Sequence, residues 1–304
     1  MTTAIVFPGM GPSRFGDAAR FMLLDPYARR RLAVADEVLG YRVAERFRDG
    51  GADYSEYAQV AFLVNCLALA DRAADRAGEE PAVCVGPSFG QKAAVAYAGS
   101  LSYEDTLRMT VAMARCEEEY FRTHHQDVVT HSFTRLPEER LKVALAELDA
   151  DGEWYEFSGY LDDGFHLLSL RGSRLDRFRK RISDLGGYSM YSMRPPVHAP
   201  AFAGLRRTVE SEVLSGIPVR APRMPLVADQ DGTVLDSAEG VRTMLLDTFD
   251  RPVDWRAVVD ALTGLGVTRL LFSGADNLFH RLDRTKRSFE IRNLTPKSAV
   301  SARR

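Results

Sequence analysis

The stretch PAVCVGPSFGQKAAVAYAG, residues 81–99, governs how the rest of the chain is interpreted. Its apolar start, AVCVG, predicts a buried strand, and its run of small residues, QKAAVAYAG, predicts a helix that packs close to a sheet. Between them, GPSFG (residues 86–90) reads G-x-S-x-G, the pattern of a sharp strand-to-helix turn that exposes a serine hydroxyl. The position of this turn makes Ser88 a candidate nucleophile, with capping of the helix by the same serine as the alternative.

Length and composition set limits on the class of protein. The 304 residues suffice for one large domain, or for a large domain with a smaller insert. The net charge of −2 gives no reason to expect nucleic acid or a membrane as a partner, so a charged partner would need a local patch. Three cysteines without metal-ligand spacing predict reduced core thiols and no metal site: Cys66, Cys84 and Cys116.

The sequence has neither a membrane-length apolar run nor the charge pattern of a signal peptide. We therefore expect a cytoplasmic protein. No oligomerisation signal is visible, so a monomer is the default expectation.

Strand and helix patterns alternate on both sides of the G-x-S-x-G turn, which predicts a parallel sheet covered by helices. Ser102 stands at the N-cap position of one helix, with Asp105 at the capping-box position. The other patterns in this part of the chain are a strand in 3–11, helices in 27–40, 56–78 and 102–122, helices in 241–249 and 255–266 that follow the run MPLVADQDG (224–232), and a strand in 268–274. The tail after residue 287 has little pattern, and we expect it to be loosely held.

Residues 127–195 read as strand, helix, two strands joined by a DDG turn, helix and strand. This β-α-β-β-α-β order is that of a ferredoxin-like subdomain. The predicted fold class is therefore α/β: a large α/β-hydrolase-like domain with a parallel sheet, formed by residues 1–126 and 196–304, with a ferredoxin-like subdomain inserted at 127–195.

A nucleophilic serine needs a base, and the chain offers six histidines. His124 and His125 follow an acidic helix and are expected at the surface, while His131 and His166 lie on predicted strands of the insert. His198 sits in MRPPVHAPAF, where the insert rejoins the large domain, and the prolines around it restrict where its imidazole can lie. His198 is therefore the candidate base.

Further motifs follow one another in a fixed order: FPGMGPS (7–13), AQVA (58–61), GPSFGQ (86–91), VAMARCEEEYF (111–121), PVHAP (196–200), RPVDW (251–255) and GADNLF (274–279). In these motifs, over nearly its whole length, the chain resembles the malonyl-CoA:acyl-carrier-protein transacylases and the acyltransferase domains of polyketide synthases. The insert also lies where that family carries its ferredoxin-like subdomain. This many motifs in register indicate the fold of that family.

The resemblance implies roles for individual residues. Ser88 matches the nucleophile and His198 the base. The backbone amides of Met10 and Phe89 match the oxyanion hole, and the backbone carbonyl of Thr248 matches the acceptor that orients the histidine. A backbone acceptor suffices for this purpose, because any group that fixes the imidazole tautomer will serve.

The resemblance also implies substrate-binding residues. Arg115 matches an arginine that clamps the free carboxylate of malonyl-type groups through paired donors, and Gln59 matches a polar residue of the substrate site. The apolar surroundings TVAMARC predict that Arg115 faces inward. The alternative is an ordinary helix arginine paired with Glu118 or Glu119.

Several positions depart from the family pattern. Proline stands at 87 instead of histidine, glutamine at 91 instead of glutamate, and methionine at 10 instead of glutamine. Val197 occupies the position of a phenylalanine in malonyl-specific relatives, which leaves room for a substituent on the acyl α-carbon. These changes predict a rebuilt pocket around the same nucleophile and base.

The sequence therefore predicts a discrete, trans-acting acyltransferase of polyketide-type or antibiotic biosynthesis. A malonyl-type acyl group, with an α-substituent allowed, would pass from a CoA or carrier-protein thioester to Ser88 and then to an acyl carrier protein. No cofactor is expected, because acyl-CoA or the phosphopantetheine thioester is a substrate. The alternatives are an acyl hydrolase, a long-chain acyl shuttle between carrier proteins, and a decayed carrier-protein docking module.

Acyl carrier proteins are acidic, so a basic patch is needed to bind one. The segment NLFHRLDRTKR, which follows GAD, predicts such a patch from four residues: Arg281, Arg284, Lys286 and Arg287. A second candidate lies on the insert helix: Arg177, Arg179, Lys180 and Arg181. An ordinary solvated helix face is the alternative for both.

Overall fold

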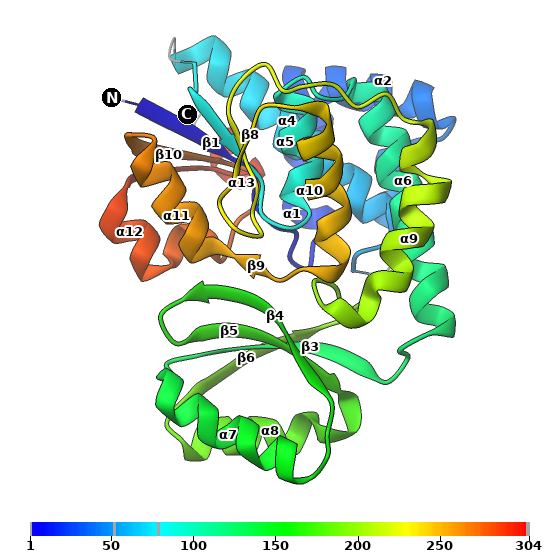
Figure 1. The fold of residues 1–304 in the computed structure, drawn as a ribbon. Helices are drawn as coiled ribbons and strands as arrows, with labels where there is room; N and C mark the ends of the chain where they lie inside the picture. The colour runs from blue at the N-terminus through cyan, green and yellow to red at the C-terminus, as the bar shows by residue number, and fades with distance from the viewer. Residues whose placement is uncertain (1, 51–52, 78–79, 302–304) are drawn as a thin grey trace.

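The computed structural model describes residues 2–50, 53–77 and 80–301. Figure 1 shows two parts: a large one, in which helices surround a sheet, and a smaller one below it, in which two helices cover one face of a second sheet. The predicted α/β fold class, with a parallel sheet in the large part, is confirmed.

The sheet of the large part has the strand order β11-β10-β1-β2-β7-β8. All neighbours in it pair in parallel except β7 and β8, which are antiparallel. Its strands are β1 (Thr2–Val6), β2 (Val83–Val85), β7 (Leu226–Val227), β8 (Val234–Leu235), β10 (Val267–Ser273) and β11 (Glu290–Leu294). The central strands β1 and β2 are buried almost throughout, which explains why both read as continuous apolar runs.

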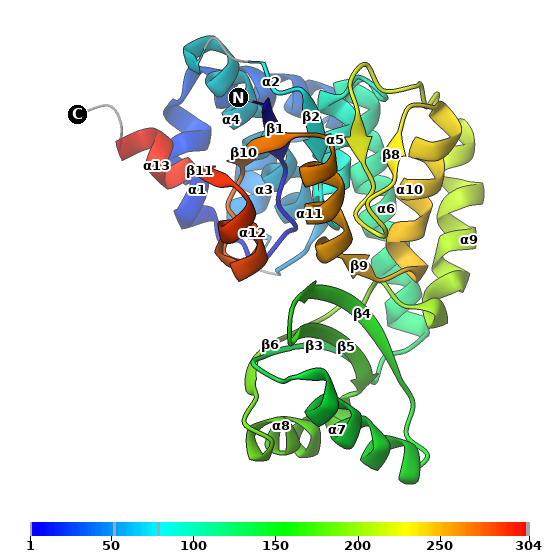
Figure 2. The ribbon, with the colours of Figure 1, turned by 60° about the vertical axis from the view of Figure 1, so that its left-hand side comes forward.

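Helices pack on both faces of this sheet (Figures 1 and 2). They are α1 (Phe15–Leu24), α2 (Pro26–Leu39), α3 (Val43–Asp49), α4 (Glu56–Ala77), α5 (Gly90–Tyr97), α6 (Tyr103–Thr123), α9 (Ala203–Glu212), α10 (Ala238–Asp250), α11 (Trp255–Gly264), α12 (Asp283–Ser288) and α13 (Pro296–Ser301). Short 3-10 turns cover Gly172–Arg174, Pro200–Phe202, Leu214–Gly216 and Phe279–Arg281. The predicted cap of α6 is confirmed, since the Ser102 hydroxyl accepts the Asp105 amide at 3.0 Å.

The smaller part has the strand order β6-β3-β5-β4-β9. Its elements are β3 (Val128–Thr134), α7 (Glu138–Ala150), β4 (Tyr155–Asp162), β5 (Phe165–Arg171), α8 (Leu175–Asp184) and β6 (Tyr188–Met193), in the predicted β-α-β-β-α-β order. The fifth strand, β9 (Val253–Asp254), comes from the large part and pairs in parallel with β4. The domain boundaries at 126/127 and 195/196 stay a prediction from the sequence.

Helices α7 and α8 cover the face of the second sheet that points away from the large part (Figures 1 and 2). Between these helices and the sheet lies a core that includes Phe133, Leu168 and Phe178. His131 and His166 lie on the strands β3 and β5, and burial lowers the pKa of each to about 4. They are core histidines, as expected for strand positions of the insert.

The expectation of a loosely held C-terminal tail is wrong for residues 288–301. Strand β11 pairs in parallel with β10, and α13 packs against α1. The Arg72 side chain also donates to the Ala299 carbonyl at 2.9 Å. The strand is only partly covered, so its sequence lacks the apolar run that identified the buried strands. Residues 302–304 of the predicted tail lie outside the described residues.

The three cysteines lie in the large part. Cys66 and Cys84 are buried, as expected for core thiols, while Cys116 is half-buried.

No helix within the described ranges is both long enough and apolar enough to cross a membrane. The described residues also contain no cluster of side chains suited to hold a metal ion.

Candidate active site

The G-x-S-x-G turn joins β2 to α5 and places Ser88 in the left-handed region, with φ of +54°. A Cβ atom at position 86 would overlap the backbone of Gly90, and one at position 90 would overlap the Phe7 carbonyl oxygen. Both glycines are therefore required by close backbone approach. Left-handed backbone costs a serine about 1–2 kcal/mol, so the surrounding structure must hold Ser88 in this conformation.

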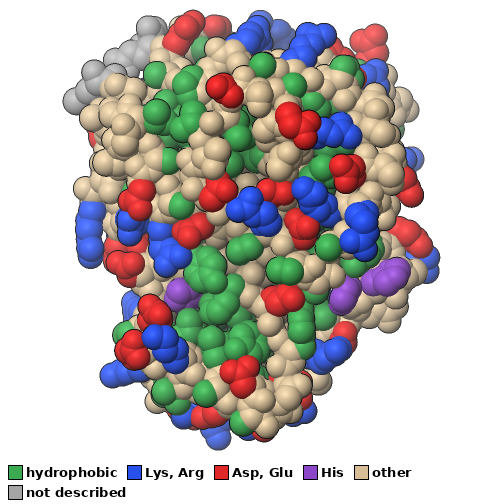
Figure 3. Space-filling model, viewed as in Figure 1, with side chains coloured by type: hydrophobic (Ala, Val, Ile, Leu, Met, Phe, Trp, Pro, Cys, Tyr) green, Lys and Arg blue, Asp and Glu red, His purple; other side chains and the backbone are tan. Residues whose placement is uncertain are grey.

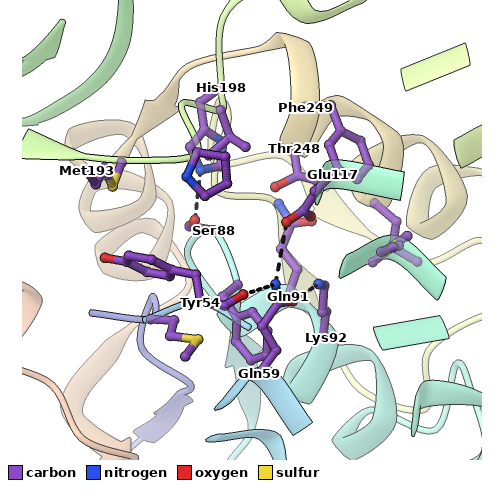
Figure 4. A pocket seen from close by; sticks show the side chains of 16 residues that line it. Tyr54, Gln59, Ser88, Gln91, Lys92, Glu117, Met193, His198, Thr248 and Phe249 are labelled. Atoms are coloured by element: carbon purple, nitrogen blue, oxygen red, sulfur yellow. Dashed lines mark hydrogen bonds between the residues drawn. The ribbon is translucent and has the colours of Figure 1, made fainter. Parts of the chain in front are cut away.

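His198 lies opposite Ser88, and the two side chains point toward each other in Figure 4. The Ser88 Oγ lies 2.7 Å from His198 Nε2. The histidine sits in the segment between β6 and α9, with φ of +68°, and only 2 % of its surface is exposed. Its backbone amide donates to the Phe249 carbonyl at 3.0 Å, which ties this segment to the end of α10.

Burial lowers the pKa of His198 to about 4, against a smaller opposing effect of the Thr248 carbonyl. The ring is therefore neutral near pH 7, and Nε2 can accept the Ser88 proton. Within the described part of the chain, Nδ1 has no partner at hydrogen-bond geometry, so the contact with Thr248 is loose. Ser88 and Thr248 thus lie beside His198 as predicted, although the hydrogen bond from Nδ1 to the Thr248 carbonyl is not formed in this structure.

The Met10 and Phe89 amides flank the nucleophile. Phe89 immediately precedes α5, where backbone N–H groups lack helical partners. A Cβ on Gly9 would lie 3.6 Å from Ser88 Cβ, so the loop that carries Met10 runs against the turn. Among the described residues, neither amide donates to a backbone or side-chain acceptor. Both are available to an oxyanion that forms beside Ser88.

A small cavity of about 80 Å³ lies beside this pair. Its walls are largely apolar and come from Met10, Tyr54, Gln59, Ser88, Phe89, Gln91, Lys92, Met113, Glu117, Met193, Pro195, Val197, His198, Leu245, Thr248 and Phe249. The structure thus brings together the residues expected for the nucleophile, base, oxyanion hole and acyl pocket, with the exception of Arg115.

The expectation that Arg115 faces inward is wrong. Its side chain is 64 % exposed, and its guanidinium pairs with Glu56 at 2.6 and 3.2 Å. The reason is helical phase, because successive residues of a helix are about 100° apart. Met113 lines the cavity, so Arg115, two positions later, points away from it. The paired carboxylate is on α4 rather than at 118 or 119, the partners considered for a surface arginine.

The polar residues of the cavity wall include two that the sequence did not single out, Lys92 and Glu117. Lys92 Nζ donates to Gln59 Oε1 at 2.9 Å, and Gln59 Nε2 lies 3.5 Å from Glu117 Oε2 (Figure 4). Burial lowers the pKa of Lys92 and raises that of Glu117, while the charge of each opposes this effect on the other. Helical spacing is the signal that was missed, because Lys92 lies three residues after Phe89 and Glu117 lies four residues after Met113, and both of these residues line the cavity.

The four residues predicted to bind a carrier protein differ in their surroundings. Arg284 pairs with Asp260 at 2.6 Å, and Lys286 pairs with Asp283 at 2.7 Å. Arg281 and Arg287 line a hollow of about 500 Å³ between α12 and the smaller part, and neither forms an ion pair with a described residue. The structure therefore leaves two of the four free to meet acidic groups.

The second candidate patch lies on α8, on the side of the smaller part that faces away from the large part (Figures 1 and 2). Arg177 pairs with Asp151, and Arg181 pairs with Glu147 at 2.6 Å. These ion pairs link α8 to α7 and to the turn after it. The helix is thus far less suited than α12 to meet a partner that must reach Ser88.

The chain is similar to known acyltransferases and transacylases. A family model described as the VinK acyltransferase small domain matches residues 132–193. The malonyl CoA-acyl carrier protein transacylase of Escherichia coli (strain K12) is 23 % identical over 273 residues, which cover 88 % of this chain and 87 % of that protein. The resemblance to the transacylase and acyltransferase family is confirmed. The polyketide biosynthesis protein ThaF of Burkholderia thailandensis is 26 % identical over 273 residues, 88 % of this chain and 22 % of that protein.

Solved structures share the fold over the whole chain. A malonyl-transacylase, solved in complex with a type II polyketide synthase acyl-carrier protein, superposes with a TM-score of 0.86 at 22 % identity, covering 99 % of both chains. The acyl-carrier-protein S-malonyltransferase of Burkholderia pseudomallei 1710b also gives a TM-score of 0.86, at 20 % identity and with 99 % of both chains covered. The predicted large domain with a ferredoxin-like subdomain is therefore confirmed as the fold.

Proposed function

We propose that this chain is a trans-acting acyltransferase that carries an acyl group on Ser88 between a thioester donor and an acyl carrier protein. The observation that carries the proposal is the 2.7 Å contact between Ser88 Oγ and His198 Nε2, on a turn flanked by two unoccupied backbone amides. The similarity to malonyl CoA-acyl carrier protein transacylases and to the VinK acyltransferase small domain supports an acyltransferase enzyme. A cytoplasmic location, a monomeric state and the lack of a cofactor stay predictions from the sequence.

In the first half-reaction, His198 Nε2 takes the Ser88 proton while Oγ attacks the thioester carbonyl carbon. The carbonyl oxygen becomes an oxyanion that accepts hydrogen bonds from the Met10 and Phe89 amides. When the intermediate collapses, the carbon–sulfur bond breaks and the leaving thiol takes the proton from His198. The products are acyl-Ser88 and a free thiol.

The second half-reaction follows the same steps in the opposite order, with the thiol of the carrier protein in place of the thiol of the donor. The carrier protein's phosphopantetheine thiol gives its proton to His198, and its sulfur attacks the acyl-Ser88 carbonyl. The same two amides stabilise the second oxyanion, and collapse returns the proton to Ser88 Oγ. Such an enzyme follows ping-pong kinetics through an acyl-serine.

The cavity favours an acyl group that lacks a free carboxylate. Arg115 does not reach the cavity, so a malonyl clamp at that position is not proposed. Among the described residues, Lys92 is the basic side chain, lysine or arginine, that lines the cavity. The nearby Glu117 offsets its charge. Otherwise the inner walls are mostly apolar. A malonyl group would have to place its carboxylate in a site whose net charge is close to zero.

A second hollow of about 320 Å³ adjoins the first and shares part of its wall: Tyr54, Gln59, Glu117 and Pro195. Together the two spaces exceed what a malonyl group requires, and Val197, which lines the first, is smaller than the phenylalanine of malonyl-specific relatives. Of the alternatives considered from the sequence, transfer of a larger acyl chain between carrier proteins therefore gains support. A malonyl-type substrate, held by Lys92, is the second candidate.

Intact-mass analysis after mixing the protein with malonyl-CoA, acetyl-CoA and a medium-chain acyl-CoA tests both candidates. We expect a single adduct, formed faster with the uncharged medium-chain donor than with malonyl-CoA. The adduct should be absent from Ser88→Ala. A malonyl adduct that forms fastest would favour the second candidate, and no adduct from any donor, CoA or carrier-borne, would argue against an enzyme.

Carrier docking is proposed at the hollow beside α12. We define the α12 patch as Arg135, Arg281 and Arg287, which line this hollow together with the partly exposed side chains of Tyr188 and Met190 on the edge strand β6. Phe279, two residues before Arg281, lies against Gly9 beside the nucleophile. The patch therefore combines three arginines with apolar surface, in a hollow whose wall also carries Asp162, Asp163 and Asp283.

A further inference from the structure

A buried carboxylate lies directly beneath the nucleophile. Asp229 follows β7, is fully buried and does not line the acyl cavity. Its Oδ2 accepts the backbone amide of Ser88 at 2.6 Å, and its Oδ1 accepts Nε2 of Gln91. Asp229 is 141 positions from Ser88 along the chain, so this contact depends on the tertiary fold. Nothing in the sequence pattern pointed to it.

The Ser88 amide needs this acceptor. In the left-handed backbone of Ser88, the N–H turns away from the helical ladder that begins at Gly90, whose own amide donates to the Pro87 carbonyl at 2.9 Å. No backbone carbonyl accepts the Ser88 amide within the described residues, while the Asp229 carboxylate does so at short range. The conformation that aims Oγ at His198 is thus held by one side-chain acceptor and by close packing of two glycines.

We propose that Asp229 is a positioning residue for the nucleophile. In the family that the chain resembles, position 91 carries a glutamate; here it carries Gln91, whose amide donates to Asp229. In the buried pair of residues 91 and 229, the carboxylate is therefore at position 229 of this chain, where it accepts the Ser88 amide directly. The departure from the family pattern at position 91 is matched by a partner across the fold, Asp229. The inference rests on the proposed function, since it concerns the serine that would carry the acyl group.

The charges around Asp229 are few. Burial raises its pKa to about 7, while the Ser88 amide and the Gln91 side chain act in the opposite sense. The negative charge of Asp231 also raises the pKa of Asp229. Asp231 is exposed and pairs with Arg251 at 3.1 Å. Asp229 touches neither the cavity nor the reacting atoms, so any effect on catalysis must pass through Ser88 and Gln91.

The hydrogen-bond pattern suggests a set of substitutions that separates positioning from simple core packing. Asp229→Leu removes the acceptor of the Ser88 amide. Asp229→Asn keeps an acceptor but turns a donor toward Gln91 Nε2, also a donor, so Gln91 must turn its unpaired Oε1 to position 229 and bury an unpaired Nε2 instead. The double variant Gln91→Glu/Asp229→Asn restores every bond, because Asn at 229 accepts the Ser88 amide and donates to Glu at 91. Asp231→Asn is the matched control at a neighbouring carboxylate.

The experiment measures the rate at which a fluorophosphonate labels Ser88, in which an oxygen–phosphorus bond forms, fluoride leaves and His198 takes the serine proton. This probe needs an activated serine but no particular acyl group. We expect about a 100-fold lower rate for Asp229→Leu, about 10-fold for Asp229→Asn, and recovery to within about 3-fold of wild type in the double variant. Asp231→Asn should label at the wild-type rate.

Thermal unfolding of each variant shows whether a slow rate reflects a lost fold. If Asp229→Leu does not fold, the comparison of Asp229→Asn with the double variant decides. The proposal is overturned if a folded Asp229→Leu labels at the wild-type rate, or if the double variant is no faster than Asp229→Asn. Wild-type protein that is never labelled would instead count against the proposed function.

Discussion

His198 has a neutral ring near pH 7 and lies within hydrogen-bond distance of Ser88 Oγ, which are the two properties a general base requires. His198→Ala should therefore slow formation of the acyl adduct by about 10²- to 10⁴-fold without loss of the fold. Quenched single-turnover reactions followed by intact mass measure this rate. An unchanged rate would assign the base to another group.

A malonyl carboxylate that enters the cavity would meet Lys92 rather than Arg115, because of these two residues the lysine lines the cavity and the arginine is exposed. Lys92→Met should lower the ratio of malonyl to medium-chain acylation rates by about 10-fold or more, since a contact to a charged group is lost. Arg115→Ala, the matched control, should leave this ratio within about 2-fold of wild type. An equal drop in both variants would restore Arg115 as a substrate residue.

Asp229 also makes stability depend on pH. Its pKa is about 7 in the folded chain, against about 3.9 in an unfolded one. The folded protein therefore binds the extra proton between these values, and this contribution to stability is lost as pH rises through 7. The Tm of Asp229→Asn minus that of wild type should grow from pH 5 to pH 8. A constant difference would show that Asp229 is charged throughout this range.

At the residue scale, the sequence could identify those residues whose role is tied to a local pattern. Ser88 stands in a strand-turn-helix motif, and His198 in a proline-rich loop. Arg115 was misplaced because an apolar stretch such as TVAMARC does not reveal which side of the helix faces the core. Asp229 could not have been found, since it meets Ser88 only when β2 and β7 pair.

Among the elements, the turn between β2 and α5 is the most constrained. Gly90→Ala should destabilise the protein by about 3 kcal/mol or more, because the new methyl group would overlap the Phe7 carbonyl oxygen. Gly264→Ala at the end of α11 is the control: nothing lies within 4 Å of its Cβ position, and alanine should be neutral or stabilising by up to about 1 kcal/mol. Chemical denaturation measures both, and equal stabilities would contradict the packing described for the turn.

The buried elements could be predicted from sequence, and the partly exposed ones could not. The strands β1, β2 and β10 are apolar because both of their faces are covered. Strand β11 is only partly covered, so its pattern did not stand out. Strand β9 has two residues and depends on β4 of the other part for its pairing, which no local pattern reports.

For the whole molecule, the division into a large part and a smaller ferredoxin-like part could be predicted because the order of helices and strands changes along the chain. The surface could be predicted less well. Basic and acidic side chains are interspersed on the face shown in Figure 3, in keeping with a net charge of −2. Which basic residues are free depends on ion pairs between elements, such as Arg284 with Asp260.

Carrier recognition is expected at the α12 patch. Arg281→Glu/Arg287→Glu should slow transfer from acyl-Ser88 to the carrier protein by about 10-fold or more at low salt, and less at high salt, where exposed charges are screened. Acylation of Ser88 by an acyl-CoA should change little. Lys180→Glu on α8 is the control and should leave both steps unchanged. Equal losses in both half-reactions, or none, would place the docking site elsewhere.

The central claim, acyl transfer through Ser88, is tested most directly on the isolated acyl-enzyme. The protein is loaded with the donor that reacts fastest, freed of that donor, and mixed with a carrier protein that bears a free phosphopantetheine thiol; the masses of both proteins are then followed over time. The account predicts that the acyl group leaves Ser88 and appears on the carrier much faster than it is lost to water, and that Ser88→Ala never becomes loaded. Loading of Ser88→Ala at the wild-type rate, or loss of the acyl group to water alone, would contradict it.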